Sequence, residues 1–329
     1  MSDNKNLLLI NGYSGIGDRI CDIVGPYILA KYLGYKLNIL LNPVNGHKHG
    51  WGITNIYDIR LFNFDNNNIK VFNNENDYNN NCKYYIKLNI HAISSAPYNI
   101  YKFIKKFNDN ITFEEIINNW NNYANEIIKP SKIIQDNIPE NLNNCYGIHL
   151  RKTDHIQDNS IYNGSSTRPD EFNIIIDALF NDISNIILTE DNPSFLLSSE
   201  DNEWKECFKN KLLNFANDNN KTINFINLNY DYSNTYDNYN AILDLFCLSK
   251  CKKIFQGVKN STYSNSAAII GNTEIINYSN LLVCYPNCLI QLYYPIIKNN
   301  NEIPYNINYI TEILSSCDSG IISNIIQKI

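Results

Sequence analysis

From residue 145 onward, short apolar segments alternate regularly with longer segments whose apolar residues recur at helical spacing. The strand candidates, runs rich in Ile, Leu, Val and Phe, are 146–151, 195–198, 223–228, 254–258 and 274–277. The helices predicted between them span 169–180, about 203–216, about 239–249 and 263–270. Strands that alternate with helices of this length form a parallel sheet with helices on both faces. The second half of the chain is therefore predicted to be an α/β domain.

The start of the chain shows the same pattern once. A strand is predicted at 7–10, a helix from Ile16 to Leu33 with a bend at Gly25-Pro26, and a second strand at 37–41. The turn before the helix holds Gly15, Gly17 and Asp18. Its backbone N–H groups suit an anion. A tight turn that needs positive φ explains these glycines equally well.

Two domains are expected from the length of 329 residues. Thr112 and Glu115 form a capping box that starts a helix ending at Lys129-Pro130. A polar connection follows, so we place the boundary after residue 140. We expect a first domain over 1–140, a second domain over 141–300, and a last helix at about 305–329 that packs back on the first domain. The fold class expected is α/β with two Rossmann-like domains facing a central cleft.

Composition excludes several classes of protein. The net charge is −6 and the basic residues are scattered, which argues against nucleic acid as the main partner. No apolar run approaches the roughly 18 residues of a membrane span, and the N-terminus lacks the apolar core of a signal peptide. The nine cysteines include no C-x-x-C pair and are expected to be reduced thiols. We therefore expect a cytoplasmic protein.

Polar side chains gather at the end of the strand that starts at Tyr146. Because side chains alternate along a strand, Ile148 points to one face and His149 to the other. Arg151, Lys152 and Asp154 follow at the carboxyl end, where ligands bind in open α/β sheets. A guanidinium can grip phosphate oxygens with two parallel hydrogen bonds. The alternative is a strand end capped by solvated charges.

Three further positions in this half point to a ligand. Ser198 ends the next strand, and Asp201 after it is expected to cap a helix rather than to bind a ribose. Asp244 interrupts an apolar helix, and a buried carboxylate needs a partner, either a protein cation or the two parallel donors of a guanine edge. Ser261 and Ser264 lie at the start of the last helix of this half, where hydroxyls and N–H groups suit an anion.

No metal motif is present in the sequence. There is no G-K-[ST] loop, no H-E-x-x-H and no D-x-D pair, and His47-Lys48-His49 has no third ligand spaced with it. No metal and no cofactor are therefore expected. If the ligand carries a diphosphate, its charge would be neutralised by arginine, lysine and helix N-termini.

Three ordered segments together resemble a known family. His149-Leu-Arg151-Lys-Thr-Asp154 is similar to the H-x-R-R-x-D motif of the α1,2-, α1,6- and protein O-fucosyltransferase superfamily, with Lys152 at a position where a second arginine is common. The segments 195–204 and 244–268 resemble its second and third motifs, and the N-terminal G-x-G-D turn also fits. The resemblance covers roughly 7–42 and 145–275, and residues 43–140 match nothing that we can place.

This resemblance implies a GT-B fold and metal-independent, inverting transfer from GDP-fucose. It also implies that 1–140 is the acceptor-side domain and 141–300 the nucleotide-sugar-binding domain. Carried over by position, His149 and Asp244 would hold guanine, Arg151 the diphosphate, and Ser261 or Ser264 the β-phosphate. The donor site would also include Ser198 and the Gly15–Asp18 turn, and Arg151, Lys152 and Asp154 are the catalytic candidates.

The function expected is thus transfer of fucose or a related deoxysugar from a GDP-sugar to a glycan or protein hydroxyl. The general base stays open among Asp18, Asp154, His155 and Asp158. One alternative is a catalytically silent sugar-binding or nucleotide-binding protein of the same fold. A dinucleotide-dependent oxidoreductase is disfavoured, because the glycines run G-x-x-G-x-G, the reverse of the dinucleotide order, and no acidic residue follows at the required distance.

Overall fold

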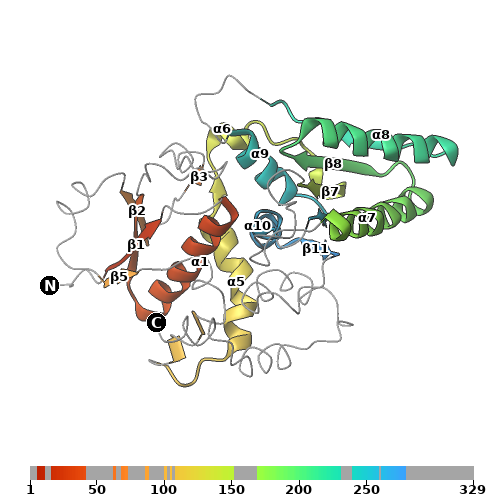
Figure 1. Ribbon diagram of the computed structural model, residues 1–329. Helices are drawn as coiled ribbons and strands as arrows, with labels where there is room; N and C mark the ends of the chain where they lie inside the picture. The colour runs from red at the N-terminus through yellow and green to blue at the C-terminus, as the bar shows by residue number, and fades with distance from the viewer. Residues whose placement is uncertain are drawn as a thin grey trace. The chain divides into compact units, whose positions relative to one another are not determined.

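The computed structural model (Figure 1) contains two compact units. It describes residues 6–11, 16–41, 62–63, 68–72, 86–88, 100–101, 104–105, 108–151, 169–230, 239–258 and 261–278. The described residues of the first unit lie within 1–136 and 239–242, and those of the second within 137–230 and 243–278. The first break thus falls four residues before the boundary expected after residue 140. The helix expected at about 305–329 lies outside the described residues.

The first unit is built on a four-stranded parallel sheet in the order β4-β2-β1-β5. Its strands are β1 (Asn6–Asn11), β2 (Lys36–Leu41), β4 (Ile69–Phe72) and β5 (Ile86–Leu88). The helix α1 (Ile16–Leu33) connects β1 to β2 and continues past Pro26, so the predicted βαβ unit is confirmed.

The helix α5 (Phe113–Ile127) buries one face, which consists of Phe113, Ile116, Trp120, Ala124 and Ile127. The hydroxyl of Thr112 accepts a 3.1 Å hydrogen bond from the Glu115 N–H, which confirms the predicted N-cap. This unit also contains a short antiparallel pair of strands, β3 (Phe62–Asn63) and β6 (Lys129–Pro130). The short helix α6 (Lys132–Gln135) follows β6 in the chain.

The second unit contains a five-stranded parallel sheet in the order β11-β10-β7-β8-β9. After the 3₁₀ turn η1 (Leu142–Asn144), its strands are β7 (Cys145–Leu150), β8 (Ser194–Ser199), β9 (Asn224–Ile226), β10 (Lys253–Gly257) and β11 (Glu274–Asn277). The connecting helices are α7 (Pro169–Thr189), α8 (Asn202–Asp218), α9 (Tyr239–Leu248) and α10 (Thr262–Gly271). The chain adds β8 and β9 on one side of β7, then β10 and β11 on the other. The strand order therefore reverses between β7 and β10, which is where ligands bind in open sheets.

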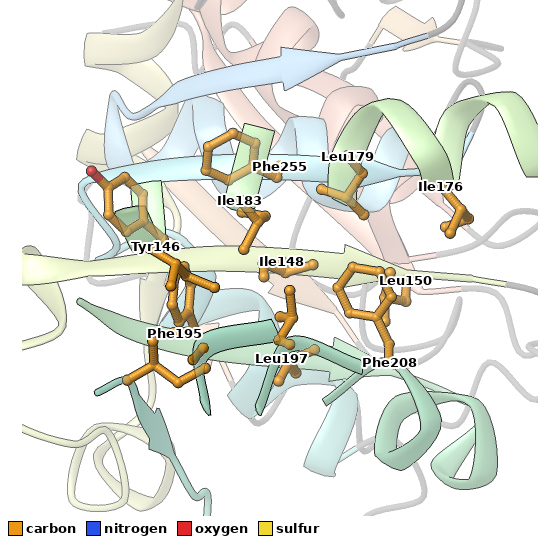
Figure 2. Packing of buried hydrophobic residues seen from close by; sticks show 14 of the residues in the cluster. Tyr146, Ile148, Leu150, Ile176, Leu179, Ile183, Phe195, Leu197, Phe208 and Phe255 are labelled. Atoms are coloured by element: carbon orange, nitrogen blue, oxygen red, sulfur yellow. The ribbon is translucent and has the colours of Figure 1, made fainter. Parts of the chain in front are cut away.

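One face of this sheet packs against α7 and α8 (Figure 2). Tyr146, Ile148 and Leu150 point from β7 into this core, as the predicted alternation requires. They meet Leu179 and Ile183 of α7. Burying several such side chains, at roughly 1.5–3 kcal/mol each, fixes the register of the central strand.

The helix α7 runs to Thr189, nine residues beyond the end predicted at 180, because Ile183 and Ile187 continue its buried face. Its residues 172–189 are long and apolar enough to cross a membrane by length and composition. Five residues of this stretch, Phe172, Ile176, Leu179, Ile183 and Ile187, belong to the core cluster, an arrangement typical of a core helix in an α/β domain.

The opposite face is covered by α9 and α10. At Gly147 of β7, a Cβ would lie 2.8 Å from the end of the Leu248 side chain and 3.2 Å from the Cys251 sulfur, so any other residue would require these side chains to shift. At Gly271, a Cβ would lie 1.8 Å from the carbonyl oxygen of Ser249, the residue that follows α9. The first approach places the end of α9 on the sheet face to which His149 points, and the second places the end of α10 beside α9.

Candidate functional site

A row of polar side chains crosses the sheet near its carboxyl edge. The register aligns Asn277, Gln256, His149 and Ser198 on β11, β10, β7 and β8. Because residues aligned in a parallel sheet share a face, all four point to the side of α9 and α10. His149, Gln256 and Ser198 are 4%, 0% and 3% exposed. Polar groups buried at a strand-order reversal are more typical of a ligand site than of a core.

Arg151 follows this row directly after the end of β7 and is half-buried. The carboxyl end of a strand is the edge at which ligands bind in open α/β sheets. The neighbouring candidates Lys152 and Asp154, and the possible bases His155 and Asp158, lie outside the described residues. Arg151 is thus the one catalytic candidate whose position is described.

Asp244 lies in α9 and is 6% exposed. The Ser198 hydroxyl donates a 2.6 Å hydrogen bond to its Oδ2, and the Tyr230 hydroxyl donates a 2.7 Å hydrogen bond to its Oδ1. Each carboxylate oxygen has two acceptor sites, so each keeps capacity for a further donor. The sequence left open a protein cation or a ligand as the partner of this carboxylate, and two protein hydroxyls contact it directly.

Opposing effects act on the pKa of Asp244. Burial raises its pKa to about 6, and the hydrogen bonds from Ser198 and Tyr230, together with the positive charge of Lys205, limit that rise. Lys205 donates a 3.1 Å hydrogen bond to the Tyr230 hydroxyl. Burial lowers the pKa of Lys205, while the charge of Asp244 acts in the opposite direction. The carboxylate therefore titrates close to the physiological range.

His149 is joined to the same cluster through Tyr263. The centroids of the two rings are 5.0 Å apart, and a hydrogen bond links Tyr263 with Ser198. Tyr263 stands in the first turn of α10, so this contact brings the start of α10 to the end of β7. A planar base would find an aromatic pair, two hydroxyls and a carboxylate at one sheet edge.

The start of α10 carries several buried polar atoms. The Oγ atoms of Ser261 and Ser264 and the Oδ1 atom of Asn265 are buried and have no hydrogen-bond partner among the described residues. Ser261 is the N-cap residue, yet its side chain does not cap the helix. A buried polar group without a partner costs roughly 1–3 kcal/mol, so such groups are typical of sites that receive a ligand or water. Combined with the free N–H groups of a helix start, they favour an anion.

Most of the predicted donor-site residues of the second half meet at this edge, namely His149, Arg151, Ser198, Asp244, Ser261 and Ser264. In the first unit, Gly17 is buried in the first turn of α1, whereas Gly15 and the Asp18 side chain lie outside what is described. Asp201 accepts a 2.9 Å hydrogen bond from the Trp204 N–H, which confirms the expected helix cap.

Four residues of this site were not predicted from the sequence, namely Tyr230, Lys205, Tyr263 and Gln256. Tyr230 and Gln256 occupy or follow strand ends, a signal that could have singled them out. Nothing in the spacing of Lys205 distinguishes it from other lysines on a helix surface. Among the described residues, no group of three or more His, Cys, Asp or Glu side chains is arranged to hold a metal ion.

No protein-family model matches the sequence, and no curated protein matches it. Solved structures do. An Arabidopsis thaliana FUT1 mutant in complex with GDP is similar with a TM-score of 0.50 and 11% identity, over 83% of this chain and 70% of that chain. Fucosyltransferase NodZ from Bradyrhizobium gives a TM-score of 0.48 at 11% identity, over 83% and 96%. POFUT1 in complex with GDP gives 0.45 at 11%, over 84% and 99%. The likeness to FUT1 confirms the predicted fold class, an α/β chain with two Rossmann-like parallel sheets of the kind found in GT-B proteins.

Proposed function

We propose that this chain is a glycosyltransferase that transfers fucose, or a related deoxysugar, from a GDP-sugar to a hydroxyl group of a glycan or protein. It would belong to the fucosyltransferase superfamily that its three sequence motifs resemble. The FUT1 structure with the same fold was solved in complex with GDP.

One observation carries the proposal. Residues from three separate sequence motifs converge on one edge of one sheet: His149 and Arg151 from the first, Ser198 from the second, and Asp244 with Ser261 from the third. This edge lies at the strand-order reversal between β7 and β10. Such convergence of segments distant in sequence is what a nucleotide site requires.

The proposed chemistry follows from the charges at this edge. The acceptor hydroxyl attacks the anomeric carbon from the face opposite the diphosphate, the bond between that carbon and the diphosphate oxygen breaks, and GDP leaves with the electron pair. The hydroxyl proton passes to a base, for which Asp18, Asp154, His155 and Asp158 are the candidates. Negative charge therefore builds on the diphosphate in the transition state. Arg151 and the N-terminus of α10 with Ser261 and Ser264 would stabilise that charge, and donors placed in advance are more effective than reorganising water.

The reaction would invert the anomeric centre and need no metal ion. The sequence provides no D-x-D pair. The proposed charge-neutralising groups are Arg151 and the start of α10. Excess EDTA should accordingly leave donor turnover unchanged, and loss of turnover that Mn²⁺ or Mg²⁺ restores would contradict this part of the proposal.

We propose a cytoplasmic location. Four of the cysteines whose side chains the structure describes, Cys145, Cys207, Cys247 and Cys251, are free thiols, and Cys207 is exposed. Free exposed thiols are common in a reducing compartment and uncommon outside it.

The test combines ligand binding with turnover. A ligand that binds the native state raises its melting temperature, so GDP should raise it more than UDP, CMP or ADP at equal concentration. GDP-fucose should then be consumed in the presence of acceptor. Stabilisation by GDP without hydrolysis or transfer would indicate a silent nucleotide-binding protein. Stabilisation by a reduced nicotinamide cofactor, and not by GDP, would indicate an oxidoreductase.

A further inference from the structure

Asp244, Tyr230 and Lys205 form a hydrogen-bonded chain that joins α9, the segment after β9, and α8. Lys205 donates to the Tyr230 oxygen at 3.1 Å, and the Tyr230 hydroxyl donates to Asp244 Oδ1 at 2.7 Å. The Lys205 ammonium also lies 4.7 Å from the centroid of the Tyr230 ring. Because the phenol oxygen accepts from a cation, its own hydrogen is directed to the carboxylate. A cation beside the phenol also strengthens that hydrogen bond.

The chain fixes the carboxylate in one orientation. Tyr230 holds Oδ1 while Ser198 holds Oδ2 at 2.6 Å, so the carboxylate plane is set from both sides. Each oxygen accepts one of these hydrogen bonds and keeps one further acceptor site. The two oxygens of a carboxylate can accept from a pair of parallel N–H donors, such as the N1–H and N2–H₂ edge of guanine.

Two further groups near Asp244, Cys247 and Tyr263, are weak acids. Burial raises the pKa of Cys247 and that of Tyr263, and the charge of Asp244 raises both further, so they stay protonated. The ring of His149 makes a tilted contact with that of Tyr263, with the centroids 5.0 Å apart. Lys205 is thus the cation that acts on Asp244 among the described residues.

We propose that Lys205 and Tyr230 are positioning residues that keep Asp244 ionised and oriented for a guanine base. This inference rests on the proposed function, because it assigns a task to residues behind the proposed nucleotide site. Neither residue needs to touch the nucleotide. Their effect would be to extend base recognition to lower pH.

The direction of the pH effect follows from the charges. Only the ionised carboxylate accepts two donors, so guanine preference should fall as the pH drops through the Asp244 pKa of about 6. Tyr230→Phe removes a hydrogen bond that favours the charged form, and Lys205→Met removes a favourable charge. Both changes should move the pH at which half of the guanine preference is lost to a higher value.

The experiment measures dissociation constants of GDP and UDP between about pH 5 and pH 8 and uses their ratio, in which titration of the shared diphosphate cancels. A midpoint raised by about one unit makes the UDP-to-GDP ratio about fivefold smaller than wild type near pH 6, and leaves it within about twofold at pH 8. Lys205→Arg keeps the charge and should restore most of the wild-type profile. Lys205 is only half-buried, so its variants remain informative if Tyr230→Phe folds poorly.

A matched control lies at the amino end of the same sheet. There Tyr146 donates to Glu190, and Lys252 contacts both the carboxylate and the Tyr146 ring. Tyr146→Phe and Lys252→Met remove the same chemistry far along the strands from the proposed site, and should leave the ratio unchanged at every pH.

Three results would overturn the inference. The pH profile of the UDP-to-GDP ratio could stay unshifted in both Tyr230→Phe and Lys205→Met, or the ratio could fall equally at all pH values in these variants. The same shift of the profile in the Tyr146→Phe control would also overturn it. A wild-type protein that binds GDP and UDP equally would instead refute the guanine assignment in the proposed function.

Discussion

Ser198 donates a 2.6 Å hydrogen bond to Asp244 from a strand end to the middle of a helix, across 46 residues of sequence. Both side chains are almost fully buried. A buried ion pair or hydrogen bond that only stabilises is readily replaced by apolar packing. A buried carboxylate held by two hydroxyls at a ligand edge is better explained by recognition, and the following predictions test that explanation.

Asp244→Asn should abolish guanine preference. The amide replaces one carboxylate oxygen by a donor, which faces a donor of the base. The stabilisation by GDP should then become equal to that by UDP in a thermal-shift panel. Asp182→Asn is the matched control, since Asp182 likewise accepts a hydrogen bond from a tyrosine, Tyr278 at 2.8 Å, on α7. A variant at 244 that still prefers GDP would refute the guanine assignment.

Arg151→Lys should fold normally, still bind GDP measurably, and lose on the order of 100- to 1000-fold in kcat. Lysine keeps the charge but not the two parallel donors, so the loss reports geometry in the transition state. Donor turnover of this variant is to be compared with that of Lys152→Ala, where a milder loss is expected. Normal turnover of Arg151→Lys with a dead Lys152→Ala would mean that the strand register or the assignment is wrong.

The removal of charge at Asp244 should change how stability depends on pH. The folded-state pKa of about 6 lies above the ordinary value of 3.8, so the native state binds more protons between these values. Stability contributed by protonated Asp244 is therefore lost as pH rises through about 6, on the order of 3 kcal/mol in total. Denaturant unfolding of Asp244→Asn should lack this loss. Parallel pH curves for the two proteins would show that Asp244 does not titrate in this range.

Ser261→Ala and Ser264→Ala should weaken GDP binding by about tenfold each, because a hydrogen bond to a charged group contributes roughly 1.5–3 kcal/mol. The free protein should be no less stable, since these hydroxyls have no partner among the described residues. Ser184→Ala is the control, as the Ser184 hydroxyl on α7 is likewise buried without such a partner. Calorimetric titration with GDP measures all three. Unchanged affinity in both α10 variants would exclude this helix start as the phosphate site.

Much of the fold could be predicted from the sequence because its signals are local. The alternation around Ile148 assigned the two faces of β7, the capping residues Thr112 and Asp201 marked two helix starts, and the order of strands and helices required parallel sheets. The end of α7 was predicted too early, since Ile183 and Ile187 extend a helical face that polar neighbours obscure.

Some residues of the candidate site could likewise be recognised from the sequence, and others could not. The sequence alone singled out Asp244, because a carboxylate in an apolar helix is locally anomalous, and it marked His149 and Arg151 by their place at a strand end. Only the tertiary structure brought Tyr230 and Lys205 to Asp244, and Tyr263 to His149. Contacts of this kind depend on how a sheet orders its strands and where helices cross it. A helix-surface lysine carries no local signal of that arrangement. The place of Tyr230 after a strand end does not show which helix its hydroxyl meets, so the part of both residues in the site depended on the packing of the whole unit.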